Sequence, residues 1–218
     1  MRADDAGSRP SVGRLAAAVL AVVAVGGAIV AVVMGRPDRG PEPEPDWRAM
    51  IASWRHPDGL PDLPLVDEHG ESFGLHALSE AWVLVGFVFT RCGNAEACPL
   101  TMDTMRAVQL AWTPEQPALH LLTVTIDPEY DTPERLVAFG ERFGRVADGP
   151  VPWTLATGDP ALLSDGLPAL FNLLVLPEDG TLSHTVKLAL LRPGLVLQAE
   201  WEGRVEPGAV FAEMSAGR

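Results

Sequence analysis

Residues 82–99, WVLVGFVFTRCGNAEACP, decide the fold. Their first eight residues form a continuous apolar run with β-branched and aromatic side chains, which is typical of a strand buried on both faces of a sheet. Two cysteines follow, Cys92 and Cys98, and the second directly precedes Pro99, a residue type favoured at the first position of a helix. The stretch therefore predicts a buried strand, a cysteine-bearing loop and a helix in immediate succession.

The residues after this unit continue to alternate between helix and strand patterns. Met102, Met105 and Val108 recur at helical spacing and indicate a helix that ends before Pro114, with both methionines in the core. Further strands are expected at 119–126, 153–156, 185–191 and 195–200, and further helices at 132–144, from 159 towards 174 and at 207–214. Helices between buried strands imply a mostly parallel sheet covered on both faces, and the last two strands read as an antiparallel hairpin. The predicted fold class is α/β, with a mixed central sheet flanked by helices.

The N-terminal part of the chain predicts a membrane anchor. Residues 15–35 contain no charged side chain and would span roughly 30 Å as a helix, about the thickness of the hydrocarbon layer. The apolar stretch continues to Met34, well past the small residues around Ala24, which favours a retained transmembrane helix over a cleaved signal peptide. We therefore expect an N-terminal tail at 1–14, the anchor at 15–35, a proline-rich acidic linker at 36–46 and a folded domain at 47–218.

Basic residues on the two sides of the anchor predict its orientation. Three arginines precede the span and two follow it closely, which favours a cytoplasmic N-terminus and a single pass through the membrane. The folded domain would then lie outside the cytoplasm, in the periplasm if the cell is Gram-negative. A pair of thiols can cycle through a disulfide in that compartment.

Composition excludes several classes of function. Sixteen Lys and Arg against 29 Asp and Glu give a net charge of −13, and a surface this acidic repels phosphate backbones, so no nucleic-acid partner is expected. Two cysteines are too few for a disulfide scaffold or for a structural zinc site with four of the usual ligands. They suffice for one redox pair or for two ligands of one metal ion.

The cysteine pair is predicted to be chemically active. Cys98 would lie at the positive end of the helix dipole, which favours the thiolate, the form that attacks disulfides and binds metals. A strand, a cysteine loop and a Cys-Pro helix start within an α/β domain indicate a thioredoxin-like fold. Five residues separate the two cysteines where thioredoxins have two, and the longer loop lets both thiolates face a single ion. A structural disulfide is the less favoured alternative at a strand-to-helix turn.

A histidine is predicted to complete a metal site. Thioredoxin-type disulfide exchangers place a cis-proline opposite the cysteines, whereas the corresponding stretch here, 182–186, contains His184 and no proline. Two thiolates and one imidazole make a soft three-coordinate site suited to Cu(I), and Cu(II) can add a water or a carboxylate. Cys92, Cys98 and His184 are therefore the candidate ligands of one copper ion per chain.

Four motifs in order resemble those of the Sco/SenC family. Thr90-x-Cys92 with Cys98-Pro99 comes first, followed by DPEYDTPE (127–134), WTLATG (153–158) and His184-Thr185. Sco/SenC proteins are membrane-anchored, thioredoxin-like copper proteins that help assemble the binuclear copper centre of cytochrome c oxidase, and the similarity runs from about residue 63 to residue 203. The resemblance implies copper ligands at Cys92, Cys98 and His184. It also implies a partner, either the copper-bearing oxidase subunit or another copper or thiol protein. The usual family spacing is three residues between the cysteines, so two more are inserted here.

Three functions of different classes remain open at this point. A copper metallochaperone would use both cysteines and His184. A thiol-disulfide oxidoreductase, which keeps the cysteines of a partner reduced, would use Cys92 and Cys98 as its catalytic redox pair without needing His184. A membrane-tethered interaction domain would need none of the three. Enzymatic activity is thus left open, and a peroxidase is least favoured because Thr90 lies only two residues before Cys92.

Other polar residues near these motifs are expected to play structural roles. The Asp127 carboxylate should cap the turn at 128–132 rather than tune the cysteine site. Glu96 is expected to be a solvated charge in the cysteine loop. The remaining histidines show no ligand spacing with one another and are expected on the surface or in loops; they are His56, His69, His76 and His120.

Overall fold

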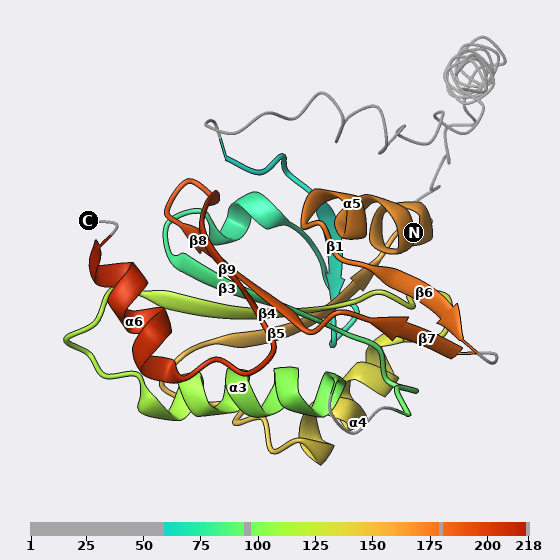
Figure 1. Ribbon diagram of the computed structural model, residues 1–218, viewed down its shortest axis with the longest axis horizontal. Helices are drawn as coiled ribbons and strands as arrows, with labels where there is room; N and C mark the ends of the chain where they lie inside the picture. The colour runs from blue at the N-terminus through green and yellow to red at the C-terminus, as the bar shows by residue number, and fades with distance from the viewer. Residues whose placement is uncertain (1–58, 94–96, 179–180, 217–218) are drawn as a thin grey trace, which may run out of the picture. The chain divides into compact units, whose positions relative to one another are not determined.

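A computed structural model of the chain describes residues 59–93, 97–178 and 181–216 (Figure 1). The predicted N-terminal tail, membrane anchor and linker, together with His56 and Glu96, lie outside these described residues. None of the helices within the described ranges combines the length and apolarity needed to cross a bilayer. The membrane anchor at 15–35 therefore stays a prediction.

Seven strands form one mixed sheet in the spatial order β2-β1-β5-β4-β3-β8-β9. Its centre is β3 (Trp82–Val88), β4 (Leu119–Thr125) and β5 (Trp153–Gly158), which run parallel to one another. The strands at either side run antiparallel to their neighbours; they are β1 (Pro64–Asp67), β2 (Ser72–Gly74), β8 (Lys187–Arg192) and β9 (Val196–Glu202). The predicted thioredoxin-like α/β fold with a mixed central sheet is confirmed.

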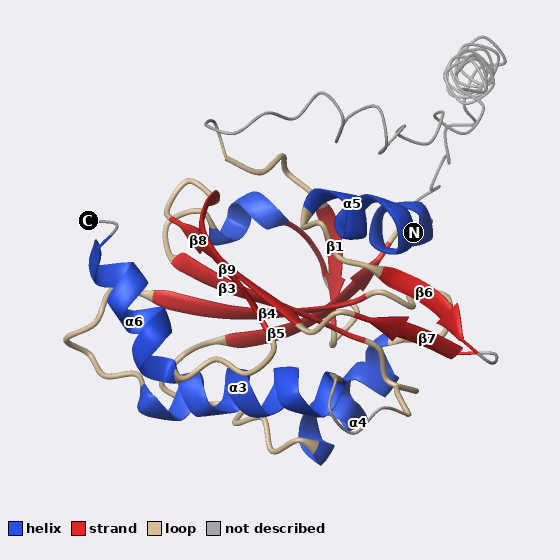
Figure 2. Cartoon of the chain, in the orientation of Figure 1, coloured by secondary structure: helices blue, strands red, loops and turns tan. Residues whose placement is uncertain are grey.

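Helices cover both faces of this sheet, as Figure 2 shows. Helices α3 (Cys98–Ala111) and α4 (Pro133–Arg142) lie on one face, and α6 (Pro207–Ala216) packs beside α3. The short α5 (Leu167–Leu170) lies on the opposite face, preceded by a π-helical turn at Leu162–Gly166 (η2); a 3₁₀ turn at Leu75–Leu78 (η1) follows β2. Burial on both sides explains why every residue of β3 is buried, as its unbroken apolar sequence predicts.

The start of α3 is held close to β3 by a glycine. A Cβ added to Gly86 would lie 2.8 Å from Cγ2 of Thr101 and 3.2 Å from Cε of Met105, so only glycine permits this approach of helix to strand. Met102 and Met105 are fully buried in the core, as their spacing predicts. Because α3 begins at Cys98, this tight packing also fixes where the cysteine sulfur lies.

Two parts of the fold differ from the sequence-based expectation. The helix expected from 159 towards 174 is shorter and irregular, since its α-helical part ends at Leu170. A second, two-stranded sheet follows, β6 (Val175–Glu178) paired antiparallel with β7 (Thr181–His184), which the sequence did not predict. His184 therefore ends a strand of a small hairpin, whereas it was expected near the start of a late strand of the main sheet.

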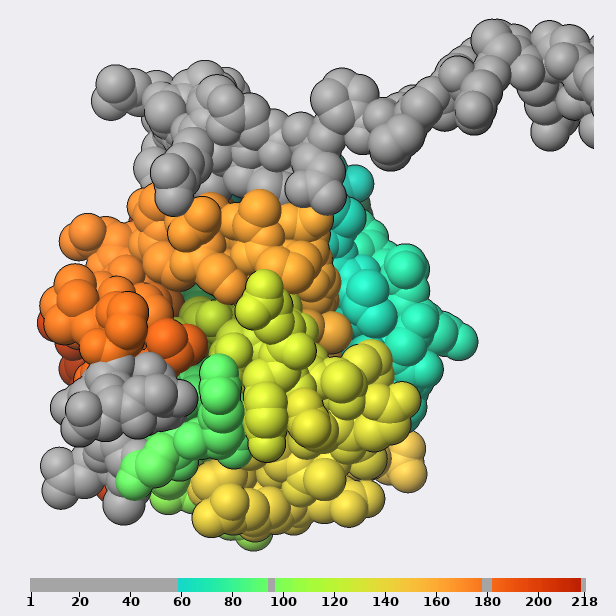
Figure 3. Space-filling model, turned by 90° about the vertical axis from the view of Figure 1, so that its right-hand side faces the viewer, coloured from blue at the N-terminus to red at the C-terminus, as the bar shows by residue number. Residues whose placement is uncertain are grey.

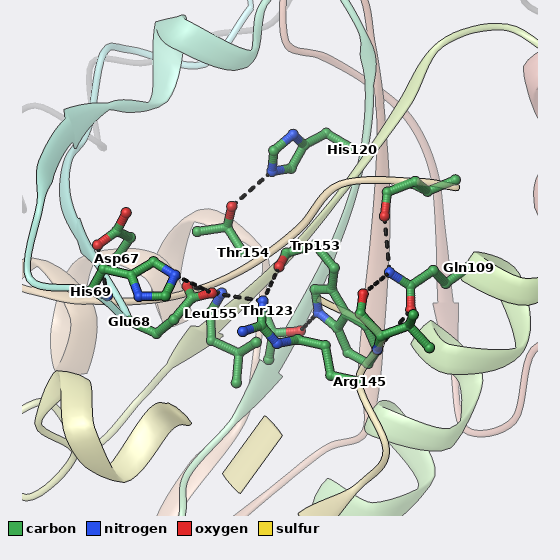
Figure 4. A network of polar contacts seen from close by, with 12 residues as sticks. Asp67, Glu68, His69, Gln109, His120, Thr123, Arg145, Trp153, Thr154 and Leu155 are labelled. Carbon is green, nitrogen blue, oxygen red and sulfur yellow. Dashed lines mark hydrogen bonds and ion pairs between the residues drawn. The ribbon is translucent and has the colours of Figure 1, made fainter. Parts of the chain in front are cut away.

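A buried ion pair ties the sheet to the loop after α4 (Figure 4). Glu68 is 5% exposed, and its Oε1 lies 2.6 Å from Nη1 of Arg145. The other carboxylate oxygen, Oε2, accepts a hydrogen bond of 3.0 Å from the backbone N of Leu155, and Arg145 also donates to the carbonyl of Trp153. Both charged groups therefore have partners, as burial requires.

Candidate metal and thiol site

Cys98 is the most deeply buried of the candidate ligands. It is the first residue of α3, its side chain is fully buried, and the backbone N of Phe89 donates to its Sγ at 3.5 Å. Phe89 directly follows β3, so the end of the central strand and the start of the helix meet at this sulfur. The strand–loop–helix unit predicted from residues 82–99 thus places the Cys98 thiol at the edge of the hydrophobic core.

His184 contacts Cys98 although the two residues are 86 positions apart in the sequence. Its Nε2 lies 3.5 Å from Sγ of Cys98, and its ring contacts that of Phe89 edge to face with 5.7 Å between centroids. The ring Nδ1 lies 2.9 Å from the carbonyl oxygen of Thr185. A carbonyl only accepts hydrogen bonds, so Nδ1 carries the proton and Nε2 presents a lone pair to the sulfur.

The environment of His184 favours its neutral form. Burial lowers the pKa of the imidazole, and the hydrogen bond to the Thr185 carbonyl opposes that effect only in part. Neutral imidazole is the form that binds metal ions. The ring is therefore already in the protonation state and tautomer of a metal ligand through Nε2.

Cys92 lies on the exposed side of the same site. It is partly buried against the hydrophobic core, and its backbone N donates to the Phe89 carbonyl at 3.2 Å. No disulfide joins it to Cys98; instead the two thiols interact, and a hydrogen bond with Cys92 is the largest cause of a raised pKa at Cys98. All three predicted ligands are thus found on segments that converge on Phe89.

The protonation of Cys98 differs from the sequence-based expectation. The helix start was expected to favour its thiolate, but its pKa is raised, by the hydrogen bond with Cys92 and then by burial, while the Phe89 amide lowers it. Desolvation of a fully buried sulfur outweighs the attraction of the helix end because the charged form loses its water on every side. The raised pKa favours the protonated thiol of Cys98, and Cys92 is the more exposed of the two sulfurs.

Asp127 has a different role from the one predicted. Its carboxylate accepts two hydrogen bonds from Arg91, at 2.6 Å from Nε and 3.2 Å from Nη2, and so does not cap the turn that follows it. The backbone of Asp127 serves that turn instead, since its carbonyl accepts from Tyr130 and Asp131. The ion pair between Asp127 and Arg91 holds in place the residue that directly precedes Cys92. Sequence reasoning missed Arg91 altogether, and only the adjacency to Cys92 could have indicated it.

Asp131 anchors the other side of the cysteine loop. It is fully buried and accepts three hydrogen bonds, from the backbone N of Thr90 at 3.0 Å, from Thr90 Oγ1 at 2.5 Å and from Thr125 Oγ1 at 2.5 Å. Burial raises the pKa of this carboxyl, and the hydrogen bonds from the two threonines act in the opposite direction. The 127–134 motif therefore has a physical role, because both of its aspartates, Asp127 and Asp131, hold the start of the cysteine loop.

None of the other histidines within the described ranges is brought to the site. His69 is exposed, and His76 lies beside Leu60, with 2.9 Å between its Nε2 and the Leu60 carbonyl oxygen. His120 departs from the expectation, since it lies on β4 and is partly buried, with Nε2 at 2.9 Å from Thr154 Oγ1 (Figure 4). Across the described ranges, no three side chains of the His, Cys, Asp or Glu type already converge in the geometry of a metal site.

Comparison with known proteins decides the family. The pattern of the SCO1/SenC family matches residues 57–216, which is most of the chain and includes every candidate ligand. The chain belongs to the SCO1/SenC family. A relative from Stutzerimonas stutzeri, whose name provisionally describes it as a copper-binding protein, is 31% identical over 157 residues, covering 62% of this chain and 72% of its own.

Solved structures of SCO1/SenC proteins share the fold. A SCO1/SenC family lipoprotein from Bacillus anthracis aligns with a TM-score of 0.63 and 22% identity over 72% of this chain and 94% of its own. ScoI from Arabidopsis thaliana, solved with copper bound, aligns with a TM-score of 0.60 and 16% identity over 73% of this chain and 99% of its own. BsSco, described as a Sco-family cytochrome c oxidase assembly protein with a disulfide switch, aligns with a TM-score of 0.61 and 19% identity over 72% of this chain and 92% of its own.

Proposed function

We propose that this protein is a copper metallochaperone that binds one copper ion through Cys92, Cys98 and His184 and transfers it to the copper-bearing subunit of cytochrome c oxidase. The observation that carries the proposal is the 3.5 Å distance between Nε2 of His184 and Sγ of Cys98, with the proton of the imidazole held at Nδ1 by Thr185. Membership of the SCO1/SenC family and copper in a solved relative support copper as the cargo. The predicted anchor would hold the domain beside a membrane-embedded oxidase.

Binding of copper would displace protons from the two sulfurs. Each cysteine binds a metal as its thiolate, so uptake of Cu(I) releases a proton from Cys98, whose pKa is raised in the metal-free protein. The charge of the ion offsets the cost of a buried thiolate. Cys92, whose thiol interacts with that of Cys98, would complete a three-coordinate site.

The experiment that tests this function is a Cu(I) titration of the reduced full-length chain in a non-ionic detergent, in competition with a chromophoric chelator. We expect one equivalent of copper to bind, and we expect His184→Ala to weaken binding by about tenfold or more. His69→Ala is the matched control, because His69 is exposed and pairs with Glu68, which is not a candidate ligand. Copper affinity that is unchanged in His184→Ala would refute the proposed ligand set.

A thiol-disulfide oxidoreductase is the second candidate function. It is favoured by the direct interaction between the two thiols and by the different exposure of the two sulfurs, which resembles an attacking and a resolving cysteine. Its test is the reduction potential of the Cys92–Cys98 pair. A potential below about −300 mV would indicate a structural bond and exclude exchange with a partner.

A further inference from the structure

A pocket lined by three arginines begins one residue before Cys92. It has a volume of about 240 Å³ and is lined by Arg91, Arg135 and Arg142 together with Thr90, Tyr130, Ala138 and Phe139. The residues 135, 138, 139 and 142 recur at helical spacing, so one face of α4 forms the wall opposite the cysteine loop. Figure 3 shows the green segment after β3 meeting the yellow segment that follows β4, with the orange β6–β7 hairpin on the other side of the green segment.

Two of the three guanidinium groups of this pocket, those of Arg91 and Arg135, are held in place. Arg91 and Arg135 both stack on the ring of Tyr130, with their Cζ atoms 4.7 Å and 3.9 Å from its centroid. Arg91 is further fixed by its two hydrogen bonds to Asp127, and Arg135 donates to the Tyr130 carbonyl. Planar donor groups that are already ordered lose little freedom when they bind a carboxylate, so Arg135 is prepared to bind an anion, whereas Arg91 already donates two hydrogen bonds to Asp127.

The pocket contrasts with the charge of the rest of the chain. The net charge is −13, and the chain has 16 basic residues against 29 acidic ones. Such a chain repels a broadly acidic partner, and only a short acidic segment can reach the three arginines without meeting that repulsion. The volume also favours a segment's side chains over a whole small molecule, because pockets that enclose drug-sized ligands are typically about 300–1,000 Å³.

We propose that this arginine pocket is the docking site for a short acidic segment of the protein that exchanges copper or thiols with Cys92. Carboxylates of that segment would bind Arg135 and Arg142, which would place the next residues of the partner beside the cysteine loop. The identity of the partner rests on the proposed function, whereas the binding of an acidic segment does not.

The test measures binding of a fluorescein-labelled hexaglutamate peptide to the reduced, copper-free, full-length chain in detergent by fluorescence polarisation. We expect the wild type to bind, and we expect the double variant Arg135→Gln/Arg142→Gln to bind about tenfold or more weakly, which corresponds to about 1.4 kcal/mol. The matched control is Arg192→Gln/Arg204→Gln, which changes the net charge equally at two exposed arginines outside the pocket. Equal weakening in both double variants, or no binding by the wild type, would overturn the proposal.

Two further measurements, peptide binding by Ala138 variants and binding of inorganic phosphate, test the same proposal. Ala138→Glu places a carboxylate in the pocket without removing an arginine and should weaken peptide binding, whereas Ala138→Gln should not; equal effects of the two would overturn the proposal. Inorganic phosphate that binds with the same arginine dependence while the peptide does not would identify a small-anion site and also overturn it.

Copper uptake of the same variants separates this proposal from the proposed function. We expect Arg135→Gln/Arg142→Gln to bind one equivalent of copper as the wild type does, because neither arginine is a candidate ligand. If the wild type bound the peptide but no copper, the metallochaperone would be refuted while the docking site stood. If the wild type bound copper but not the peptide, the docking site would be refuted while the metallochaperone proposal stood.

Discussion

Nε2 of His184 lies 3.5 Å from Sγ of Cys98, although the two residues are separated by 86 positions in the sequence. Phe89 brings them together, since its backbone N donates to the sulfur and its ring packs against the imidazole. A single residue at the end of the central strand thus supports both donors. The geometry of the site depends on the strand end and on the small hairpin, not on the cysteine loop alone.

The two cysteines should differ in reactivity. Cys98 is fully buried with a raised pKa, whereas Cys92 is only partly buried, so iodoacetamide should modify Cys92 about tenfold or more faster near neutral pH. Mass spectrometry of the alkylated peptides over time measures both rates in the copper-free protein. The rates should converge in denaturant, and faster modification of Cys98 in the folded protein would contradict the burial described here.

Removal of the Asp131 carboxylate should destabilise the cysteine loop. Asp131→Ala leaves the backbone N of Thr90 and the hydroxyls of Thr90 and Thr125 without their acceptor in a buried place. We expect the free energy of unfolding to fall by about 2–4 kcal/mol, measured by denaturant titration. Asp103→Ala, at an exposed position of α3, is the control and should change it by less than about 0.5 kcal/mol.

Stability should fall in acid because His120 resists protonation. Burial lowers its pKa from the usual 6.5, with Glu68 acting in the opposite direction, so below about pH 6.5 the unfolded chain gains a proton that the folded chain does not. The free energy of unfolding should therefore decrease as the pH falls below that value, by up to about 1.4 kcal/mol per pH unit for one such group. His120→Gln should flatten the profile between pH 5 and 7. An identical slope in wild type and variant would exclude this role.

The only lysine of the chain should support the turn before the β6–β7 hairpin. Lys187 is buried, and its Nζ donates to the carbonyls of Phe171 and Asn172 while lying 3.6 Å from Glu200. Lys187→Met leaves both carbonyls unpaired and should lower the free energy of unfolding by about 1–3 kcal/mol. It should also weaken copper binding, since this turn leads into the hairpin that carries His184. Glu202→Gln changes an exposed ion-pair partner of Lys187 and should have little effect on either the free energy of unfolding or copper binding.

Much of the fold is predictable from local patterns. The apolar run at 82–89, the helical spacing of Met102 and Met105 and the Thr132-Pro133 start of α4 each correspond to a real element, because burial and the fixed φ of proline act locally, although the Thr132 side chain makes no capping hydrogen bond. The β6–β7 hairpin was missed because its strands are only four residues long and Pro177 interrupts the pattern of β6. Short strands carry too little periodicity to be recognised.

The proximity of His184 to Cys98 was predictable from the sequence, the surroundings of the site were not, and metal binding by these residues stays a prediction. Cys92, Cys98 and His184 follow from residue types and motif order. The pairing of Arg91 with Asp127 joins residues 36 positions apart, so no local pattern reports it. The protonation of Cys98 was mispredicted because the sequence shows a helix start but not how completely the sulfur is enclosed.

The β6–β7 hairpin is a separate two-stranded sheet that shares no strand pairing with the seven-stranded sheet, and it carries His184 at its end. Under the proposed ligand set, a copper ion would therefore be held between two sheets that no strand pairing joins, with His184 on one sheet and both cysteines beside the other.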